Sequence, residues 1–453
     1  MVPGASKNLQ IAERRGHLGT LPRRLGIAPS IALIVGFIIG SGIFRSPSRV
    51  ALEAGSARVA LLAWGLGGVI ALAGSLSLAE LGAMFPRAGG VYVFLYEAYG
   101  PGIAFLKGWV YLIIGPSAWA ALALIFAEYA RNFLPMSEMG VHILAVVLIA
   151  TLAAMGCRSL SLAAWVQTVS TWAKVTALLG MAMALFFLGR HNPAPVAIAA
   201  EHWHGLSGLG LALVPVMFAY DGWNGFTAMS GEVRNPRRTI PISLAAGVIT
   251  VAAVYVVVNL AYFSVLPFGF VQRSNQVAAD AVSVIAGRAG TTVLSLLVML
   301  ATFSSLNATV ITDPRICFAM AETGLFFRSV GRVHPRWGTP YVAIVLNALL
   351  GCAYVLGRSF DQLAEAFVLG VWPFLALAVA AVPVLRWTHP ELSRPYRTAA
   401  YPVLPVLFVL VSVAMIVNAL YRHPISTAIS FLILLIGLPV YWAWRKFAAN
   451  DQR

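Results

Sequence analysis

Long apolar runs alternate with short polar segments along almost the whole chain. Most of these runs are close to the length of about 20 residues that an α-helix needs to cross the hydrocarbon of a bilayer. The pattern therefore predicts an all-α membrane protein with twelve transmembrane helices. The predicted spans are residues 27–52, 58–84, 100–130, 140–157, 163–189, 206–229, 241–266, 290–321, 340–357, 362–386, 401–420 and 425–445.

The composition agrees with this interpretation. Of the 453 residues, 60% are hydrophobic and 10% are charged, whereas soluble domains are about 45–50% apolar and about 25% charged. The net charge of +15 does not indicate a nucleic-acid partner, because the basic residues lie in short clusters between apolar runs. Cys157, Cys317 and Cys352 lack the spacing of metal ligands, so we expect no metal, no cofactor and no disulfide framework.

The distribution of basic residues predicts the orientation in the membrane. With the N-terminus in the cytoplasm, the inner segments carry many more Lys and Arg residues than the outer ones, as in the cluster Arg234, Arg237 and Arg238. This bias is typical of cytoplasmic loops. We therefore expect a multi-pass protein of the cell (inner) membrane with both termini cytoplasmic and without a cleaved signal peptide.

The first predicted span contains an interruption. Its apolar segment 34–44 includes Gly36, Gly40 and Gly42, and Pro47 follows. Glycine in a helix interior costs about 1 kcal/mol relative to alanine. Irregular backbone at membrane depth is tolerated only where it is buried in protein or lines a cavity. The segment therefore predicts a broken helix; the alternative is close packing of small residues against another helix.

The sixth predicted span contains a second interruption. Asp221-Gly222 and Asn224-Gly225 lie in the middle of residues 206–229. An ionisable residue at membrane depth is a functional-site hypothesis by default. The interrupted spans are the first and the sixth, which is expected of two inverted repeats of five helices with broken helices in corresponding positions.

The two interruptions together predict a ligand. A half-helix that begins near residues 41–43 would present free N–H groups and a positive dipole end, which suit a carboxylate. A half-helix that ends near residues 218–220 would present free carbonyl groups, which suit an ammonium group. A carboxylate site beside an ammonium site matches an α-amino acid.

Several motifs resemble the amino acid–polyamine–organocation superfamily, and within it the L-type amino-acid transporter group. They are Ile39–Phe44 (IGSGIF), Leu78–Gly82 (LAELG), Phe85–Tyr92 (FPRAGGVY), Glu97–Ala98, Ala104–Trp109 (AFLKGW), Phe218–Asn224 (FAYDGWN), and Glu232 with Asn235–Pro241 (NPRRTIP). The resemblance extends over most of the first ten spans. It implies a leucine-transporter-type 5+5 inverted repeat with broken helices 1 and 6, two extra helices, and alternating access.

The resemblance also implies site residues. Residues of the first interruption would hold the substrate carboxylate: Gly40, Ser41, Gly42 and Ile43. Residues of the second would lie at the amine or beside the substrate: Phe218, Ala219, Tyr220, Asp221, Gly222 and Trp223. Phe218 is the candidate for an aromatic gate on the outward side.

Lys174 lies in the middle of the fifth predicted span. The family places a lysine here, where sodium-coupled relatives of the fold bind a cation. The resemblance implies that its ammonium replaces sodium, together with the hydroxyls of Ser304 and Ser305, so that transport does not depend on sodium. The alternative is a lysine that extends to a membrane interface.

The predicted function is secondary active transport of L-α-amino acids with neutral side chains, by sodium-independent exchange or proton coupling. The alternative is a carrier of cationic amino acids or polyamines that uses Asp221. A membrane enzyme is not expected, because no span holds a suitable cluster of His, Asp and Glu or a nucleophile with a base. No charge ring or filter sequence of a channel is present.

The resemblance also predicts the division of the chain. Residues 1–26 would form a cytoplasmic tail, 27–386 the ten-helix transport core, 387–446 two accessory helices and 447–453 a second cytoplasmic tail. Animal L-type chains carry a cysteine in the outer loop after the third helix, which links them to a glycoprotein. The corresponding loop 131–140 has no cysteine, so we expect a stand-alone, prokaryotic carrier without a disulfide-linked heavy subunit.

Overall fold

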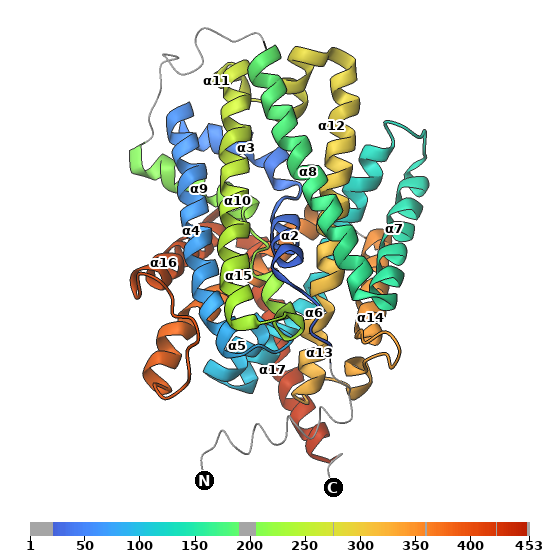
Figure 1. Ribbon diagram of the computed structural model, residues 1–453, viewed down its shortest axis with the longest axis vertical. Helices are drawn as coiled ribbons and strands as arrows, with labels where there is room; N and C mark the ends of the chain where they lie inside the picture. The colour runs from blue at the N-terminus through green and yellow to red at the C-terminus, as the bar shows by residue number, and fades with distance from the viewer. Residues whose placement is uncertain (1–20, 190–204, 275, 358–359, 423, 451–453) are drawn as a thin grey trace.

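The computed structural model describes residues 21–189, 205–274, 276–357, 360–422 and 424–450. Within these ranges the regular structure is helical, apart from one isolated bridge between Leu25 and Val233. Most of the long helices run along the long axis of the molecule (Figure 1). The fold is therefore the all-helical bundle expected from the apolar runs.

The first half of the chain forms two short helices, then four long ones with a short helix between. They are α2 (Ile27–Ile38), α3 (Gly42–Ala54), α4 (Ala57–Met84), α5 (Val91–Tyr99), α6 (Pro101–Ala130), α7 (Glu138–Arg158) and α8 (Leu160–Leu188). The predicted spans 58–84 and 163–189 begin and end within three residues of the bounds of α4 and α8. Length and hydropathy are thus sufficient to locate these elements.

The second half contains the remaining helices. They are α9 (Gly205–Ala219), the 3₁₀ helix η1 (Gly225–Glu232), α10 (Pro236–Val265), α11 (Phe268–Val271), α12 (Val277–Thr312), α13 (Pro314–Glu322), the 3₁₀ helix η2 (Arg328–Gly331), α14 (Tyr341–Gly357), α15 (Phe360–Thr388), α16 (Val403–Arg422) and α17 (Pro424–Asn450). Gly287, with a φ of 52°, bends α12 near its beginning.

Within the described ranges, six helices are long and apolar enough to cross a membrane, and the bent pair of α2 and α3 is a seventh candidate. Other helices are apolar over shorter stretches of the described residues, such as Tyr341–Gly357 and Val403–Asn418. The protein is thus a multi-pass membrane protein, and the count of twelve spans stays a prediction.

Side-chain caps fix the beginnings of three long helices. Ser56 accepts a hydrogen bond from the amide of Val59 at α4, Ser137 from that of Gly140 at α7, and Ser159 from that of Leu162 at α8. Each serine satisfies one of the amides that a helix N-terminus leaves without an intrahelical partner. The sequence therefore marks where these helices begin.

Both predicted interruptions are present. α2 and α3 meet at an angle of 51° across residues 39–41. α9 ends at Ala219, and the chain passes through Gly222, with a φ of +116°, before η1 begins. α2 packs against α8, α10 and α12 and lies in the interior of the bundle (Figure 1).

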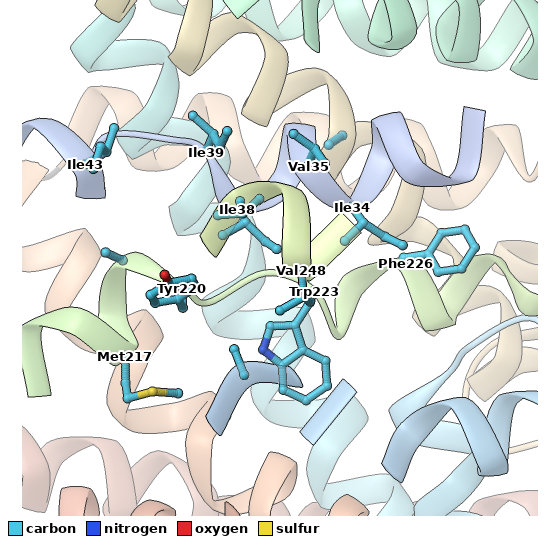
Figure 2. Packing of buried hydrophobic residues seen from close by; sticks show 14 of the residues in the cluster. Ile34, Val35, Ile38, Ile39, Ile43, Met217, Tyr220, Trp223, Phe226 and Val248 are labelled. Atoms are coloured by element: carbon cyan, nitrogen blue, oxygen red, sulfur yellow. The ribbon is translucent and has the colours of Figure 1, made fainter. Parts of the chain in front are cut away.

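The two interrupted segments contact each other through apolar side chains. Ile34 and Ile38 of α2 and Phe226 of η1 belong to one buried cluster with Val248 of α10 (Figure 2). In a membrane the lipid tails are as apolar as these side chains, so the contact stabilises the pair mainly through van der Waals packing. The cluster holds the first and sixth segments together on one side of their breaks.

Hydrogen bonds and ion pairs also join helices at the end of the bundle where α2 begins and η1 ends. The amide of Leu25, just before α2, donates to the carbonyl of Glu232 at the end of η1 over 3.0 Å. The carboxylate of Glu232 pairs with Arg315 of α13 at 2.8 Å, and both side chains are buried. Glu80 of α4 pairs with Arg386 of α15 at 2.7 Å. This end of the bundle is therefore closed by charged contacts.

Candidate functional site

A cavity of about 130 Å³ lies between the two interruptions. Four parts of the chain line it: the break between α2 and α3, the C-terminal half of α6, the end of α9 with the following turn, and α12. The lining residues are Phe37, Ile38, Gly40, Ser41, Gly42, Ala118, Ala121, Leu122, Phe218, Ala219, Asp221, Gly222, Ser305 and Thr309. The cavity has a polar end at the two breaks and an apolar wall on α6.

The structure brings most of the sequence-predicted residues together at this cavity. From the first break these are Gly40, Ser41 and Gly42. From the second they are Phe218, Ala219, Asp221 and Gly222, and from α12 Ser305. Phe218 is 39% exposed, so its ring stands at the open side of the cavity rather than in the core.

Three predicted residues have side chains that do not line the cavity. Ile43 is fully buried in the core. The Tyr220 hydroxyl donates to the carbonyl of Trp64 over 3.0 Å. Trp223 packs edge-on against Phe408 and points away from α2 (Figure 2). The side chains of consecutive residues at a helix break face different directions. A sequence motif alone therefore does not tell which of them face the ligand.

The N-terminus of α3 offers free hydrogen-bond donors to the cavity. The first amides of α3 with a backbone acceptor are those of Phe44 and Arg45, which both donate to the carbonyl of Ser41. In the described chain the amides of Ser41, Gly42 and Ile43 donate to no backbone oxygen, and Ser41 makes no side-chain cap. Such donors at a positive helix end form an anion site. Ser41 and Gly42 line the cavity, whereas Ile43 does not.

The end of α9 offers carbonyl groups on the opposite side. The carbonyl of Phe218 accepts from the amide of Asp221 over 3.3 Å, and that of Ala219 accepts from the Tyr255 hydroxyl over 3.0 Å. A carbonyl oxygen has two lone pairs, so each can accept a second hydrogen bond. The same Tyr255 hydroxyl lies 3.1 Å from the carbonyl of Ile38 and thus connects the ends of α9 and α2.

Two glycines allow the broken helices to approach each other. A Cβ on Gly42 would lie 2.9 Å from the Cα of Ala219. A Cβ on Gly222 would lie 2.5 Å from the ring of Phe37, and its φ of +116° is also unfavourable for other residues. The glycines of both breaks therefore serve contact between the two segments.

Lys174 of α8 holds the unwound end of α2. Its ammonium donates to the carbonyls of Gly36 and Ile39 over 2.8 and 2.5 Å. The Ser305 hydroxyl reaches the same two carbonyls over 2.9 and 3.1 Å. The lysine side chain is 0% exposed, so it does not extend to a membrane interface. The carbonyls that the break leaves without a helical partner thus accept hydrogen bonds from an ammonium group and a hydroxyl.

Ser304 belongs to a neighbouring polar network instead. Its hydroxyl lies 3.2 Å from the amide nitrogen of Gln167 and 3.3 Å from the hydroxyl of Thr171, which itself donates to the carbonyl of Ala32. Asn307 donates to Gln167 over 2.8 Å. We did not expect this network, although polar residues within predicted spans are the signal that could have indicated it.

A second polar pocket, of about 10 Å³, lies on the other side of the second break. Lys107 and Tyr111 of α6, Asn224, and Asp313 between α12 and α13 are among its lining residues. Asp313 accepts hydrogen bonds from Tyr111 and Trp119, each over 2.8 Å. Lys107 and Asp313 were not among the predicted site residues, but ionisable residues inside predicted spans could have identified them.

Comparison with known proteins gives one family. The model of the family described as amino acid permease matches residues 25–441. The serine/threonine exchanger SteT of Bacillus subtilis is 31% identical over 95% of this chain and 98% of its own length. The human cystine/glutamate transporter is 31% identical over 93% of this chain and 85% of its own. The human b(0,+)-type amino acid transporter 1 is 31% identical over 93% of this chain and 88% of its own length.

Proposed function

The chain belongs to the amino acid permease family of the amino acid–polyamine–organocation superfamily, and from this we propose that it moves L-α-amino acids across the cell membrane by alternating access. Its family and its relatives are transporters rather than enzymes. The relatives named above carry different amino acids, so the family supports the class of ligand but leaves the side chain open.

One observation carries the proposal. Ser41 and Gly42, which have free amides, and Phe218 and Ala219, whose carbonyls can accept a further hydrogen bond, line the same cavity. The first group suits a carboxylate and the second an ammonium group. Every α-amino acid presents these two groups on one carbon atom, so the backbone of the two breaks can bind the part that all substrates share.

The walls of the cavity support a neutral side chain. Beyond the two breaks the lining side chains of α6 are apolar: Ala118, Ala121 and Leu122. Phe218, at the open side, adds an aromatic ring that can cover the bound substrate. The second candidate, a carrier of cationic amino acids or polyamines, is supported by the carboxylate of Asp221, which also lines the cavity.

The proposed mechanism does not use sodium. Lys174 occupies the carbonyls of Gly36 and Ile39 that the break leaves free, and a fixed ammonium there removes the need for a bound metal cation. Sodium-independent exchange and proton coupling both fit this arrangement. No cofactor takes part in the proposed mechanism.

The proposed setting is an inner membrane, with twelve spans, two inverted repeats of five and both termini in the cytoplasm. The core would comprise residues 27–386 and the accessory helices 387–446. The outer loop 131–140 contains no cysteine, which supports a carrier that works without a disulfide-linked heavy subunit.

Ligand-induced thermal stabilisation tests the proposal directly on the purified protein. A ligand that binds only the folded state raises the unfolding temperature. We expect neutral L-amino acids to do so in sodium-free buffer, whereas the corresponding amines and carboxylic acids, each lacking one of the two groups, do not. Stabilisation by an amine alone would instead support the polyamine carrier, and no effect of any amino acid would refute binding at this site.

A further inference from the structure

The last helix of the chain, α17, contacts the segment that follows α13. The ring of Tyr441 packs against that of Phe105 of α6, with 5.3 Å between the ring centres. Trp444 lies three residues further along α17 and thus on the same helix face. Its indole N–H donates to the carbonyl of Gly324 over 3.0 Å. The elements α5 and α13 and the C-terminal part of α17 lie at one end of the bundle (Figure 1).

Two phenylalanines after α13 extend this contact. The ring of Trp444 lies edge-on to that of Phe327, with 4.8 Å between the centres, and stacks on that of Phe326 at 6.2 Å. Aromatic pairs at these distances contribute more than the area that they bury. We call Trp444 together with Gly324, Phe326 and Phe327 the α17 latch. It consists of one directional hydrogen bond and two ring contacts.

The carbonyl of Gly324 can accept this hydrogen bond because of the way in which α13 ends. Gly324 has a φ of +78°. The amides of Gly324 and Leu325 donate back to the carbonyls of Ala321 and Met320. This is the Schellman pattern, in which a glycine in the left-handed region closes a helix. The α17 latch therefore contacts the C-terminal turn of α13 itself.

The two ends of α13 have different partners. At its C-terminal end, the hydroxyl of Thr323 lies 2.6 Å from that of Tyr92, a buried residue of α5. Near its N-terminal end, the guanidinium of Arg315 donates twice to the carboxylate of Glu232, over 2.8 and 3.3 Å. A helix of nine residues is only about two and a half turns long. The position of its C-terminal turn therefore also determines the position of Arg315.

We propose that Trp444 positions α13 so that Arg315 pairs with Glu232, and that α17 thereby keeps closed the side of the transport core that we predict to face the cytoplasm. The inference rests on the proposed alternating access, in which this ion pair separates when that side opens. A buried ion pair depends on good geometry, because only good geometry compensates for the desolvation of both charges. Trp444 does not line the substrate cavity, so it is a positioning residue.

The test measures how often this side opens, through the reactivity of a cysteine placed next to the ion pair. Ile316 follows Arg315, lines the small pocket beside the second break and is 6% exposed. The parent protein for the test is Ile316→Cys with Cys157, Cys317 and Cys352 replaced by alanine. Its thiol is protected from a maleimide in the closed state, so the labelling rate of the purified protein follows the fraction of open molecules.

We expect labelling at least about threefold faster in Trp444→Phe, which keeps a ring but removes the N–H that donates to Gly324. Trp444→Ala also loses the ring contacts and should label faster still. Trp442→Ala is the matched control, because Trp442 lies on the same helix but is 69% exposed; it should label at the parent rate. Thermal stabilisation by a neutral L-amino acid should persist in Trp444→Phe, because the cavity is unchanged.

A second reporter separates opening of this side from a general loosening of the fold. Val355 is fully buried near the C-terminal end of α14, and Val355→Cys in place of the first reporter should label equally with and without Trp444→Phe. Phe327→Leu weakens the α17 latch from its other side and should accelerate labelling at Ile316→Cys even if Trp444→Ala does not fold.

Parent labelling rates in both Trp444→Phe and Phe327→Leu would overturn this inference. An equal acceleration in Trp442→Ala, or at the Val355→Cys reporter, would overturn it as well. These rates are measured without substrate, so they judge the role of Trp444 alone. A protein that no amino acid stabilises would instead refute the proposed function.

Discussion

Lys174 is the side chain on which the broken first helix most directly depends. It is buried, and its ammonium donates to two carbonyls that the end of α2 leaves without a helical partner. Ser305 of α12 supports the same carbonyls. The proposed substrate site begins one residue further along, at Gly40, so a change at Lys174 should affect how the break moves more than what it binds.

We predict that Lys174→Ala lowers the rate of amino-acid exchange at least about tenfold, because each lost hydrogen bond of a charged group is worth about 1.5–3 kcal/mol. Substrate affinity, measured by thermal stabilisation, should change much less. Lys446→Ala, which removes an exposed lysine of α17, is the control and should exchange normally. An unchanged exchange rate in Lys174→Ala would remove this lysine from the mechanism.

Gly42 is required for a different reason, because there is no space for a side chain at this position. A side chain at this position would collide with the backbone of Ala219 before it reached the ligand. We predict that Gly42→Val abolishes substrate-induced stabilisation and lowers the unfolding temperature of the ligand-free protein, because α3 and α9 are forced apart. Gly65→Val in α4, where a Cβ meets no atom within 4 Å, is the matched control. Wild-type affinity in Gly42→Val would contradict the site.

At the level of elements, the two broken helices are joined across their ends. The Tyr255 hydroxyl of α10 lies within hydrogen-bond distance of the carbonyls of Ile38 and Ala219. Tyr262, two turns further along the same helix, is also buried, but its hydroxyl has no hydrogen-bond partner in the described part of the chain. The two tyrosines form a natural pair for comparison.

We predict that Tyr255→Phe lowers the stability of the purified protein, since it removes the hydroxyl that donates to the buried carbonyl of Ala219, at a cost of about 1–3 kcal/mol. Tyr262→Phe removes an unsatisfied hydroxyl and should be neutral or slightly stabilising. Thermal unfolding in detergent, followed by tryptophan fluorescence, measures both. Equal unfolding temperatures for the two variants would show that Tyr255 does not tie the broken helices together.

The elements themselves could be predicted from the sequence because hydropathy and helix length act locally. The bounds of the apolar run 58–84 almost coincide with those of α4. Both breaks were predicted because glycine is unfavourable within a helix and Asp221 is costly in a membrane. These signals need no knowledge of the neighbouring helices.

Contacts between distant segments could not be predicted in this way. The sequence does not tell that Tyr220 turns to Trp64 or that Gly42 contacts Ala219, because the direction of a side chain at a break depends on the packing of both segments. Asp313 lies 202 positions from Tyr111 along the chain, so their hydrogen bond could not be inferred from spacing. The two breaks that line the cavity were predictable, whereas the residues of its α6 wall were not.

At the scale of the whole molecule, the elements divide into two ends around one cavity. On one side of the breaks, Glu232 with Arg315 and Glu80 with Arg386 hold the helices together. On the other side the cavity is lined by α3, α6 and α9, with Phe218 partly exposed. The proposed alternating access would require the charged contacts to separate while the cavity closes, and the proposed binding groups lie between these two regions.

Exchange in sodium-free proteoliposomes tests the central claim most directly. Vesicles loaded with an unlabelled neutral L-amino acid are placed in a choline buffer that contains the labelled form, and empty vesicles serve as the comparison. We predict that internal amino acid or an imposed proton gradient drives uptake, and that adding sodium does not change it. No uptake of any L-amino acid above that of protein-free vesicles, or uptake that requires sodium, would contradict this account.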